Sequence, residues 1–256
     1  MTSWDPTRYL QFADDRSRPF VDLVARIDAD PGTIVDLGCG PGHLTAVLRA
    51  RWSDAVVHGV DSSPEMIDRA TADADGDPAT YELADVGTWE PAAPVDLMIS
   101  NALFQWVPEP IGVVERLATH VAPGGTFALQ VPRNYDAPSH TLLRDMGAEA
   151  PYGRFTEDIV ADRSTEPAAW LDLFAGLGWD VDVWETTYLH VLQGGDPVFE
   201  WISGTGARPY LQALPDGLRG QFVDDYKAAL REAYPAGPTG TIFPFRRTFV
   251  VARRSR

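Results

Sequence analysis

The sequence has little cysteine, little lysine and no long apolar run. Its single cysteine, Cys39, excludes an internal disulfide and any metal site built from several cysteines. No apolar run approaches the roughly 18 residues that a membrane helix needs. The opening residues 1–6 have neither the basic nor the apolar part of a secretion signal. These features predict a cytoplasmic protein without a membrane partner.

Positive charge is also scarce. The chain has 21 Lys and Arg against 37 Asp and Glu, a formal net charge of −16, and Lys227 is its only lysine. Such a field repels polynucleotides and anionic lipids, so we expect no nucleic-acid partner. The five histidines show no ligand spacing, and no metal site is predicted. The sequence leaves the oligomeric state open.

Strand and helix patterns alternate between residues 34 and 132, which is typical of a parallel sheet covered by helices on both faces. Pro64 suits a first helical turn, with Ser62 or Ser63 as its cap. The strands are expected at Ile34–Leu37, Val56–Asp61, Thr80–Leu83, Val95–Ser100 and Thr126–Val131, and the helices at His43–Arg51, Pro64–Ala72 and Ile111–Val121.

The rhythm changes after residue 133, where helices interrupt the sheet pattern. No linker, repeat or low-complexity stretch separates the two parts. We therefore expect one domain over residues 1–256, with a cofactor-binding core at 30–132 and lid or cap elements at 1–25 and 133–240. Helices are expected at His140–Glu149, Ala168–Leu177, Asp196–Leu214 and Leu218–Tyr234, and strands at Trp179–Leu192 and Thr241–Ala252.

A glycine turn, with Gly38, Gly40 and Gly42, follows the first expected strand. Glycines there allow a ligand to approach the main chain closely. A dinucleotide site prefers G-x-G-x-x-G, but the third glycine position is His43, and no Gly-Lys-Ser/Thr follows to make a phosphate loop. Asp36, just before the turn, would repel a phosphate and attract an ammonium group. S-adenosylmethionine (SAM) carries an amino group and a sulfonium and no phosphate, so this pattern favours SAM.

Acidic and polar residues end the following strands. Asp61 stands where a doubly wound fold places an acid for ribose hydroxyls, and Asp85 could accept a hydrogen bond from the adenine amino group. Val86 or Met66 could pack against the base, and Asn101 ends the fourth strand. The predicted cofactor site comprises Asp36, Gly38, Cys39, Gly40, Asp61, Ser62, Met66, Asp85, Val86 and Asn101.

Residues 30–132 resemble the class I SAM-dependent methyltransferases, through Asp36, Gly38, Gly40, Asp61 and Asp85 together. The resemblance implies an α/β, Rossmann-like, seven-stranded mixed sheet with helices on both faces and a helical cap from later insertions. The strands at Trp179–Leu192 and Thr241–Ala252 would be the last two, the final one antiparallel.

The chain resembles one family within that class more closely, the trans-aconitate 2-methyltransferases. The stretches that carry this resemblance span nearly the whole chain: Trp4-Asp5-Pro6, Arg16-Ser17-Arg18-Pro19, Asp61-Ser62-Ser63-Pro64, Gln105-Trp106, Thr186-Thr187-Tyr188, Thr205-Gly206, Arg208-Pro209 and Phe249-Val250-Val251-Ala252. The resemblance implies transfer of a methyl group to one carboxylate of trans-aconitate or a related small polycarboxylate.

This reaction needs no general base, because a carboxylate is already ionised at neutral pH, so no catalytic residue is predicted. Arginine forks could hold the remaining carboxylates of the substrate. The candidates are Arg208, Arg247, Arg16 and Arg18, and Gln105, Trp106, Tyr9, Tyr188 and Trp201 could wall the acceptor pocket. Surface ion pairs for the arginines and core packing for the aromatic residues are the alternatives; His190, in an apolar strand, is interpreted as structural.

Other functions stay open at this point. The protein could methylate another small acid or a hydroxyl group, or it could be a non-catalytic SAM-binding module. An NAD-dependent dehydrogenase is disfavoured by His43 at the third glycine position.

Overall fold

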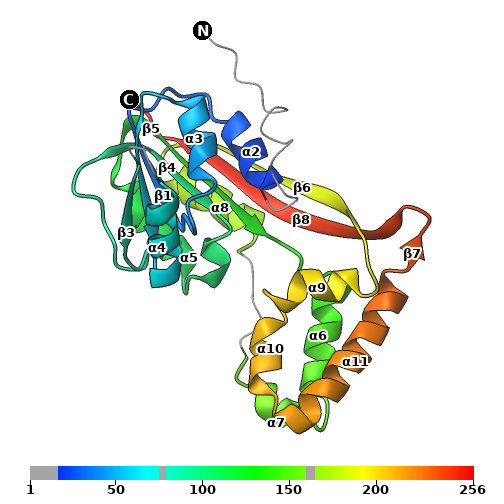
Figure 1. Ribbon diagram of the computed structural model, residues 1–256. Helices are drawn as coiled ribbons and strands as arrows, with labels where there is room; N and C mark the ends of the chain where they lie inside the picture. The colour runs from blue at the N-terminus through cyan, green and yellow to red at the C-terminus, as the bar shows by residue number, and fades with distance from the viewer. Residues whose placement is uncertain (1–16, 75–78, 160–164) are drawn as a thin grey trace. The chain divides into compact units, whose positions relative to one another are not determined.

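The computed structural model describes residues 17–74, 79–159 and 165–256, and its strands form one mixed sheet (Figure 1). The strand order is β3-β2-β1-β4-β5-β8-β6, and the short β7 pairs with β8. The strands are β1 Thr33–Leu37, β2 Val56–Asp61, β3 Thr80–Leu83, β4 Val95–Asn101, β5 Val121–Pro132, β6 Asp180–Leu192, β7 Ala236–Gly237 and β8 Gly240–Arg253. The Rossmann-like fold that was predicted is confirmed, with β7 as a small addition to the seven expected strands.

The first five strands run parallel, in the pairs β1–β2, β1–β4, β2–β3 and β4–β5. β8 runs antiparallel to β5, because rising residue numbers on β5 meet falling numbers on β8. The Gly124 amide donates to the Arg254 carbonyl at 3.1 Å, and the Arg133 amide donates to the Arg246 carbonyl at 2.8 Å. From β1, successive strands of the chain are added on one side as far as β3 and then, from β4, on the other side. Open α/β sheets bind ligands at such a switch point, here between β1 and β4.

The described residues pack into two compact units. The first unit holds the described residues before Pro132, with Thr165–Glu185 and Thr248–Arg256. The second unit holds the described residues from Pro132 to Ser164, with Thr186–Arg247. The boundary at Pro132 falls where the strand–helix rhythm of the sequence changes. A single domain with cap elements stays a prediction.

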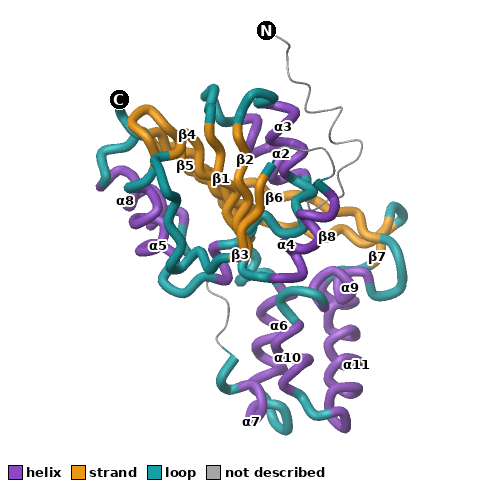
Figure 2. Tube along the Cα trace, turned by 60° about the vertical axis from the view of Figure 1, so that its left-hand side comes forward, coloured by secondary structure: helices purple, strands orange, loops and turns teal. Residues whose placement is uncertain are grey.

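In the first unit, helices cover both faces of the sheet: α2, α3 and α4 lie on one face, and α5 and α8 lie on the other (Figure 2). Prolines in the first turn start several of them, and the Ser63 hydroxyl caps α4 by accepting from the Met66 amide at 3.3 Å. These helices are α2 Arg18–Ala25, α3 Thr45–Arg51, α4 Pro64–Asp73, α5 Pro110–Ala118 and α8 Pro167–Gly176.

Buried aromatic rings anchor the chain just after β4. Phe104, in the short 3-10 helix Phe104–Trp106, packs its ring 6.4 Å from Phe127 and 6.2 Å from Trp170. All three side chains are at most 1% exposed. Because burying such rings stabilises a fold strongly, this core fixes the segment that follows β4.

The second unit is built mainly from helices, and α6, α10 and α11 lie alongside one another (Figures 1 and 2). Its core includes Phe199, Phe222, Tyr226 and Phe243. The helices of this unit are α6 Pro138–Ala148, α7 Gly153–Thr156, α9 Pro197–Ser203, α10 Arg208–Ala213 and α11 Asp216–Ala233. No helix of the described residues has both the length and the apolar character needed to cross a membrane.

Two predicted helices differ from the structure by more than two residues. The helix expected over Asp196–Leu214 is two helices, because α9 ends at Ser203 and α10 begins at Arg208. Gly204 and Gly206 lie in the break, where glycine lowers the stability of a continuous helix. The helix expected to reach Val121 ends at Ala118, and Val121 begins β5 instead.

Candidate functional site

The glycine turn has a conformation that side chains disfavour. Gly38, Gly40 and Gly42 have φ angles of +72°, +56° and +78°. A Cβ added at Gly38 would lie 2.9 Å from the Leu103 Cβ, whereas one added at Gly40 would meet no heavy atom within 4 Å. Gly38 is therefore required for packing, and the backbone at Gly40 stays open to a ligand.

The amide groups of this turn are already used within the protein. The amides of Gly38 and Cys39 both donate to the Val60 carbonyl, at 2.8 and 3.1 Å, and the Gly40 amide donates to the Asp61 carboxylate at 2.9 Å. A pyrophosphate needs free amides pointing at it. These three amides are therefore not available to the pyrophosphate of a dinucleotide.

Two carboxylates lie at the carboxyl ends of β1 and β2. Asp36 is 2% exposed, and its burial, together with the negative charge of Asp61, raises its pKa to about 7. The Asp61 carboxylate is held by two amides, those of Gly40 and Ser63, each at 2.9 Å. Each oxygen of Asp61 keeps lone-pair capacity, so it can still accept from ligand hydroxyl groups. The pair favours a ligand that is positively charged and carries hydroxyls.

Cys39 lies beside this pair and is buried. Burial raises the pKa of the Cys39 thiol, and the charges of Asp36 and Asp61 raise it further. The thiol therefore stays protonated at neutral pH, and a nucleophilic role is ruled out for it by its surroundings.

The loop after β3 forms a tight turn. The Asp85 side chain accepts from the Gly87 amide at 2.8 Å, and its carbonyl accepts from the amides of Thr88 and Trp89 at 3.0 and 2.8 Å. Asp85 is exposed, whereas Val86 is buried. The loop thus offers one carboxylate next to an apolar side chain, an arrangement that suits a flat nitrogen base.

A cavity of about 450 Å³ in the first unit joins the turn, the end of β2 and this loop. This volume lies in the range of ordinary small-molecule sites. Its lining residues are Gly38, Val60, Asp61, Ser62, Ala84, Asp85, Val86, Gly87, Thr88, Leu103, Trp106, Val107, Pro108 and Val113. The structure therefore brings Gly38, Asp61, Ser62, Asp85, Val86 and Trp106 of the predicted site together around one cavity.

Other predicted residues of the first unit do not line this cavity. Asp36 and Cys39 are buried, Gly40 lies in the turn, and Met66 is 42% exposed on α4. Sequence reasoning missed the apolar wall made by Leu103, Val107, Pro108 and Val113. The only sequence signal for this wall was its position: the four residues follow the end of β4, which was already expected to bind a ligand.

The segment after β4 has a strained backbone. Ala102 has a φ of +57°, which costs free energy for a residue with a side chain. Gln105 donates to the Ala102 carbonyl at 2.6 Å, and Gln130 donates to the amide oxygen of Asn101. This bond orients the Asn101 amide, although Asn101 does not line the cavity, whereas Trp106, 52% exposed, does.

In the second unit, some of the predicted substrate residues gather around His190. Its ring lies 4.5 Å from Trp201 and 6.3 Å from Tyr188. The Arg247 guanidinium lies 4.8 Å above the Phe245 ring, and Arg247 is 5% exposed. A buried arginine beside aromatic rings is an environment in which a carboxylate ligand would bind strongly.

The remaining predicted substrate residues are placed differently. Arg208 is exposed at the start of α10 in the second unit. In the first unit, Arg18 begins α2 and lies 4.0 Å from Asp22. Tyr9 and Arg16 lie outside the described residues. Within the described part of the chain, no group of three or more His, Cys, Asp or Glu could hold a metal ion.

Comparisons with known proteins identify the family of this chain. A family model described as a methyltransferase domain matches residues 9–183. A trans-aconitate 2-methyltransferase from Streptomyces avermitilis is 48% identical, over 98% of this chain and 97% of the relative. One from Rhodococcus jostii is 46% identical over 98% and 99%, and one from Methylobacterium nodulans is 43% identical over the full length of both.

Solved structures support the fold. The YcgJ protein from Bacillus subtilis matches with a TM-score of 0.59 at 13% identity, over 93% of this chain and 97% of that one. The methyltransferase of Haloferax volcanii in complex with the Trm112 activator matches with a TM-score of 0.57 at 23% identity, over 98% and 94%. At these identities the likeness concerns the fold alone.

Proposed function

Because this chain belongs to the family of the trans-aconitate 2-methyltransferases, we propose that it transfers the methyl group of SAM to one carboxylate of trans-aconitate or a closely related small polycarboxylate. The product would be a monomethyl ester. With a net charge of −16, the proposed partners are small molecules of the cytoplasm and not nucleic acids or membranes.

One observation carries the choice of cofactor. Asp36 and Asp61 lie together beside a turn whose amides are already hydrogen-bonded within the protein. This arrangement repels phosphate and favours a cationic nucleoside. SAM meets both conditions, since it carries an ammonium and a sulfonium and no phosphate.

Four residues of the cofactor site have a proposed role. Asp61 would accept hydrogen bonds from the ribose hydroxyls, and Asp36 would stabilise the positive charge of the ligand. Asp85 would accept from the amino group of the base, with Val86 and the apolar wall against its faces. SAM, when bound, supplies a methyl group on a sulfonium that a carboxylate oxygen can displace.

On the acceptor side, the protein has only to orient an anion that is already a nucleophile. The pKa of an ordinary carboxylic acid lies near ~4, so no residue has to remove a proton. Orientation alone can supply roughly 7–11 kcal/mol of a barrier. We propose Gln105 and Trp106 as walls near the reacting carboxylate, with Arg208, Arg247, Arg18, Arg16, Tyr9, Tyr188 and Trp201 as the remaining candidates for holding substrate.

The test is an assay with SAM labelled in its methyl group and a panel of small acids that includes trans-aconitate. We expect label in trans-aconitate, released as volatile methanol by mild base, as an ester requires. Asp61→Asn should abolish this transfer, whereas Asp68→Asn, at an exposed position of α4, should leave it unchanged.

Other outcomes would contradict the proposal in distinct ways. Base-stable label would indicate methylation of nitrogen, carbon or a hydroxyl group. Binding of SAM without transfer to any acid would indicate a non-catalytic binding module. Failure to bind SAM would remove the cofactor itself from the assignment.

A further inference from the structure

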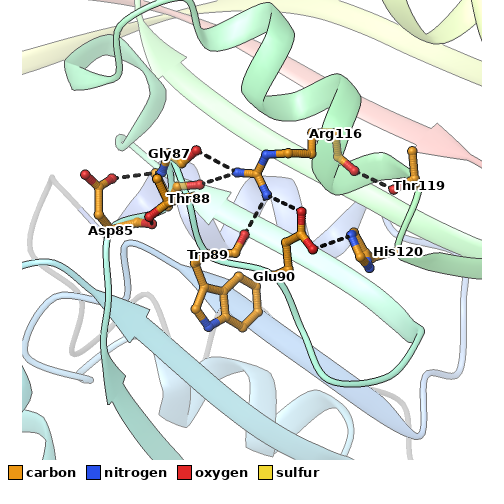
Figure 3. Close-up of polar contacts among 9 residues, drawn as sticks. Asp85, Gly87, Thr88, Trp89, Glu90, Arg116, Thr119 and His120 are labelled. Atoms are coloured by element: carbon orange, nitrogen blue, oxygen red, sulfur yellow. Dashed lines mark hydrogen bonds and ion pairs between the residues drawn. The ribbon is translucent and has the colours of Figure 1, made fainter.

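The loop after β3, which forms part of the cofactor cavity, is held in place by one arginine of α5. The Arg116 guanidinium donates to the carbonyls of Val86 and Gly87 at 2.8 and 3.0 Å and to the Trp89 carbonyl at 2.7 Å (Figure 3). A single side chain thus binds three main-chain carbonyls of residues 85–90. No motif in the sequence pointed to it.

A second set of contacts orients this guanidinium. Glu90 lies 3.4 Å from Arg116 and 3.7 Å from the imidazole of His120, so the carboxylate bridges two basic side chains (Figure 3). Trp89 is 8% exposed, and its indole N–H donates to Glu82 at 3.0 Å. The loop is therefore fixed both through its carbonyls and through a buried ring.

The chemistry of arginine explains why this residue suits the task. Its planar fork presents five N–H donors at fixed angles, which lets it satisfy several separate carbonyls at once. A lysine ammonium concentrates three donors on one atom and would reach fewer of them. Hydrogen bonds from a charged donor are also stronger than those between neutral groups.

The contacts of Arg116 bear on a ligand because the same short loop faces the cavity. Asp85, Val86, Gly87 and Thr88 all line it, and the Asp85 side chain is tied to the Gly87 amide at 2.8 Å. A shift of the Val86 and Gly87 carbonyls would therefore turn the Asp85 carboxylate. Arg116 itself is not a lining residue, so any effect on the ligand passes through the loop.

We infer that Arg116 is a positioning residue that holds Asp85 in the orientation required to recognise the base of the cofactor. This inference rests on the proposed binding of SAM. A carboxylate accepts a hydrogen bond from the amino group of adenine and repels the oxygen that replaces that group in hypoxanthine. Base discrimination is thus the property that Arg116 controls.

The experiment compares two ligands that differ at one edge of the base, S-adenosylhomocysteine and S-inosylhomocysteine: the second carries a carbonyl oxygen in place of the amino group and a proton on the neighbouring ring nitrogen. Their dissociation constants are measured by calorimetry for the wild type, Arg116→Lys, Arg116→Met and Arg49→Met. Arg49 is the matched control, because it donates to the Ala55 carbonyl at 2.6 Å but does not line the cavity.

The wild type should prefer the adenosyl ligand by about 10- to 100-fold, the range for one hydrogen bond to a charged group. Both Arg116 variants should bind the adenosyl ligand more weakly and lose most of this preference, Arg116→Met more than Arg116→Lys. Arg49→Met should keep the wild-type preference even where its melting temperature falls.

The outcomes separate the inference from the proposed function. If the wild type binds the adenosyl ligand and both Arg116 variants keep its full preference, the positioning role is refuted and the SAM assignment stands. If the wild type binds neither ligand, the SAM assignment fails and the inference fails with it. If Arg116→Met does not fold, Arg116→Lys decides by the same ratio.

Discussion

Binding of SAM should weaken as the pH falls, because the cation needs Asp36 in its ionised form. Burial and the nearby charge of Asp61 raise the pKa of Asp36 to about 7 in the free protein. A bound cation stabilises the ionised form and lowers this pKa. The free protein must then release a proton to bind, and each pH unit below about 7 should cost roughly tenfold in affinity. At about pH 5 the affinity should be about 100-fold below its value at pH 8.

The sign of the stability effect follows from the same shift. The pKa of Asp36 is raised from its ordinary value of 3.8, so the folded state keeps a proton that the unfolded chain releases. The contribution of this group to the free energy of unfolding is complete below about pH 4 and is lost as the pH rises through about 7. The rise in melting temperature caused by SAM should therefore grow across the same window.

Calorimetry with SAM between about pH 5.5 and 8.5 tests this, in two buffers of different ionisation enthalpy that together count the protons released. Asp36→Asn should bind weakly at every pH, because its amide cannot gain a charge. Asp68→Asn, exposed on α4, is the control and should follow the wild type. A wild-type affinity that does not change over this range, or binding near pH 6 without proton release, would refute the reasoning.

Two further predictions concern the turn and the substrate arginines. Gly38→Ala should destabilise the protein by about 2–4 kcal/mol in urea unfolding, since its left-handed φ and the 2.9 Å contact with a leucine both oppose a Cβ. Gly40→Ala should cost only about 1–2 kcal/mol but should impair SAM binding, because its Cβ would enter space that is open to a ligand; an unchanged Kd for SAM would contradict a ligand at Gly40. Arg247→Met or Arg208→Met should raise the KM for the acceptor about 10- to 100-fold while the Kd for SAM stays unchanged, and unaltered kinetics in both would exclude arginine binding of the substrate.

Much of the sheet could be predicted because its signals are local. β2 and β3 begin and end at the predicted residues, since apolar runs bounded by turn residues define buried strands. The start of α4 was also predictable, because Pro64 and its serine cap act within one turn. The break between α9 and α10 was missed, since the apolar pattern continues on both sides of Gly204 and Gly206.

The candidate site likewise contains residues that the sequence indicates and residues that it does not. The glycine turn and Asp61 belong to motifs with fixed spacing, so the sequence alone indicated them. The role of Leu103 depends on contact with Gly38, which lies in the turn after β1 and is distant in the sequence. Arg116 binds main-chain carbonyls, which every residue carries, so its target leaves no mark in the sequence. Such residues emerge only when separate elements are seen packed together.

The rejection of a dinucleotide by this site follows from two independent physical causes. The missing third glycine is the weaker one, since it concerns only how closely the helix packs against the strand. The stronger cause is that the turn amides already bind the Val60 carbonyl and the Asp61 carboxylate, while Asp36 is buried just beneath them. A pyrophosphate would find the amides of Gly38, Cys39 and Gly40 already bonded and would add negative charge to two carboxylates that already repel each other. A cation relieves that repulsion, so the charge that destabilises the free protein is the same charge that selects its ligand.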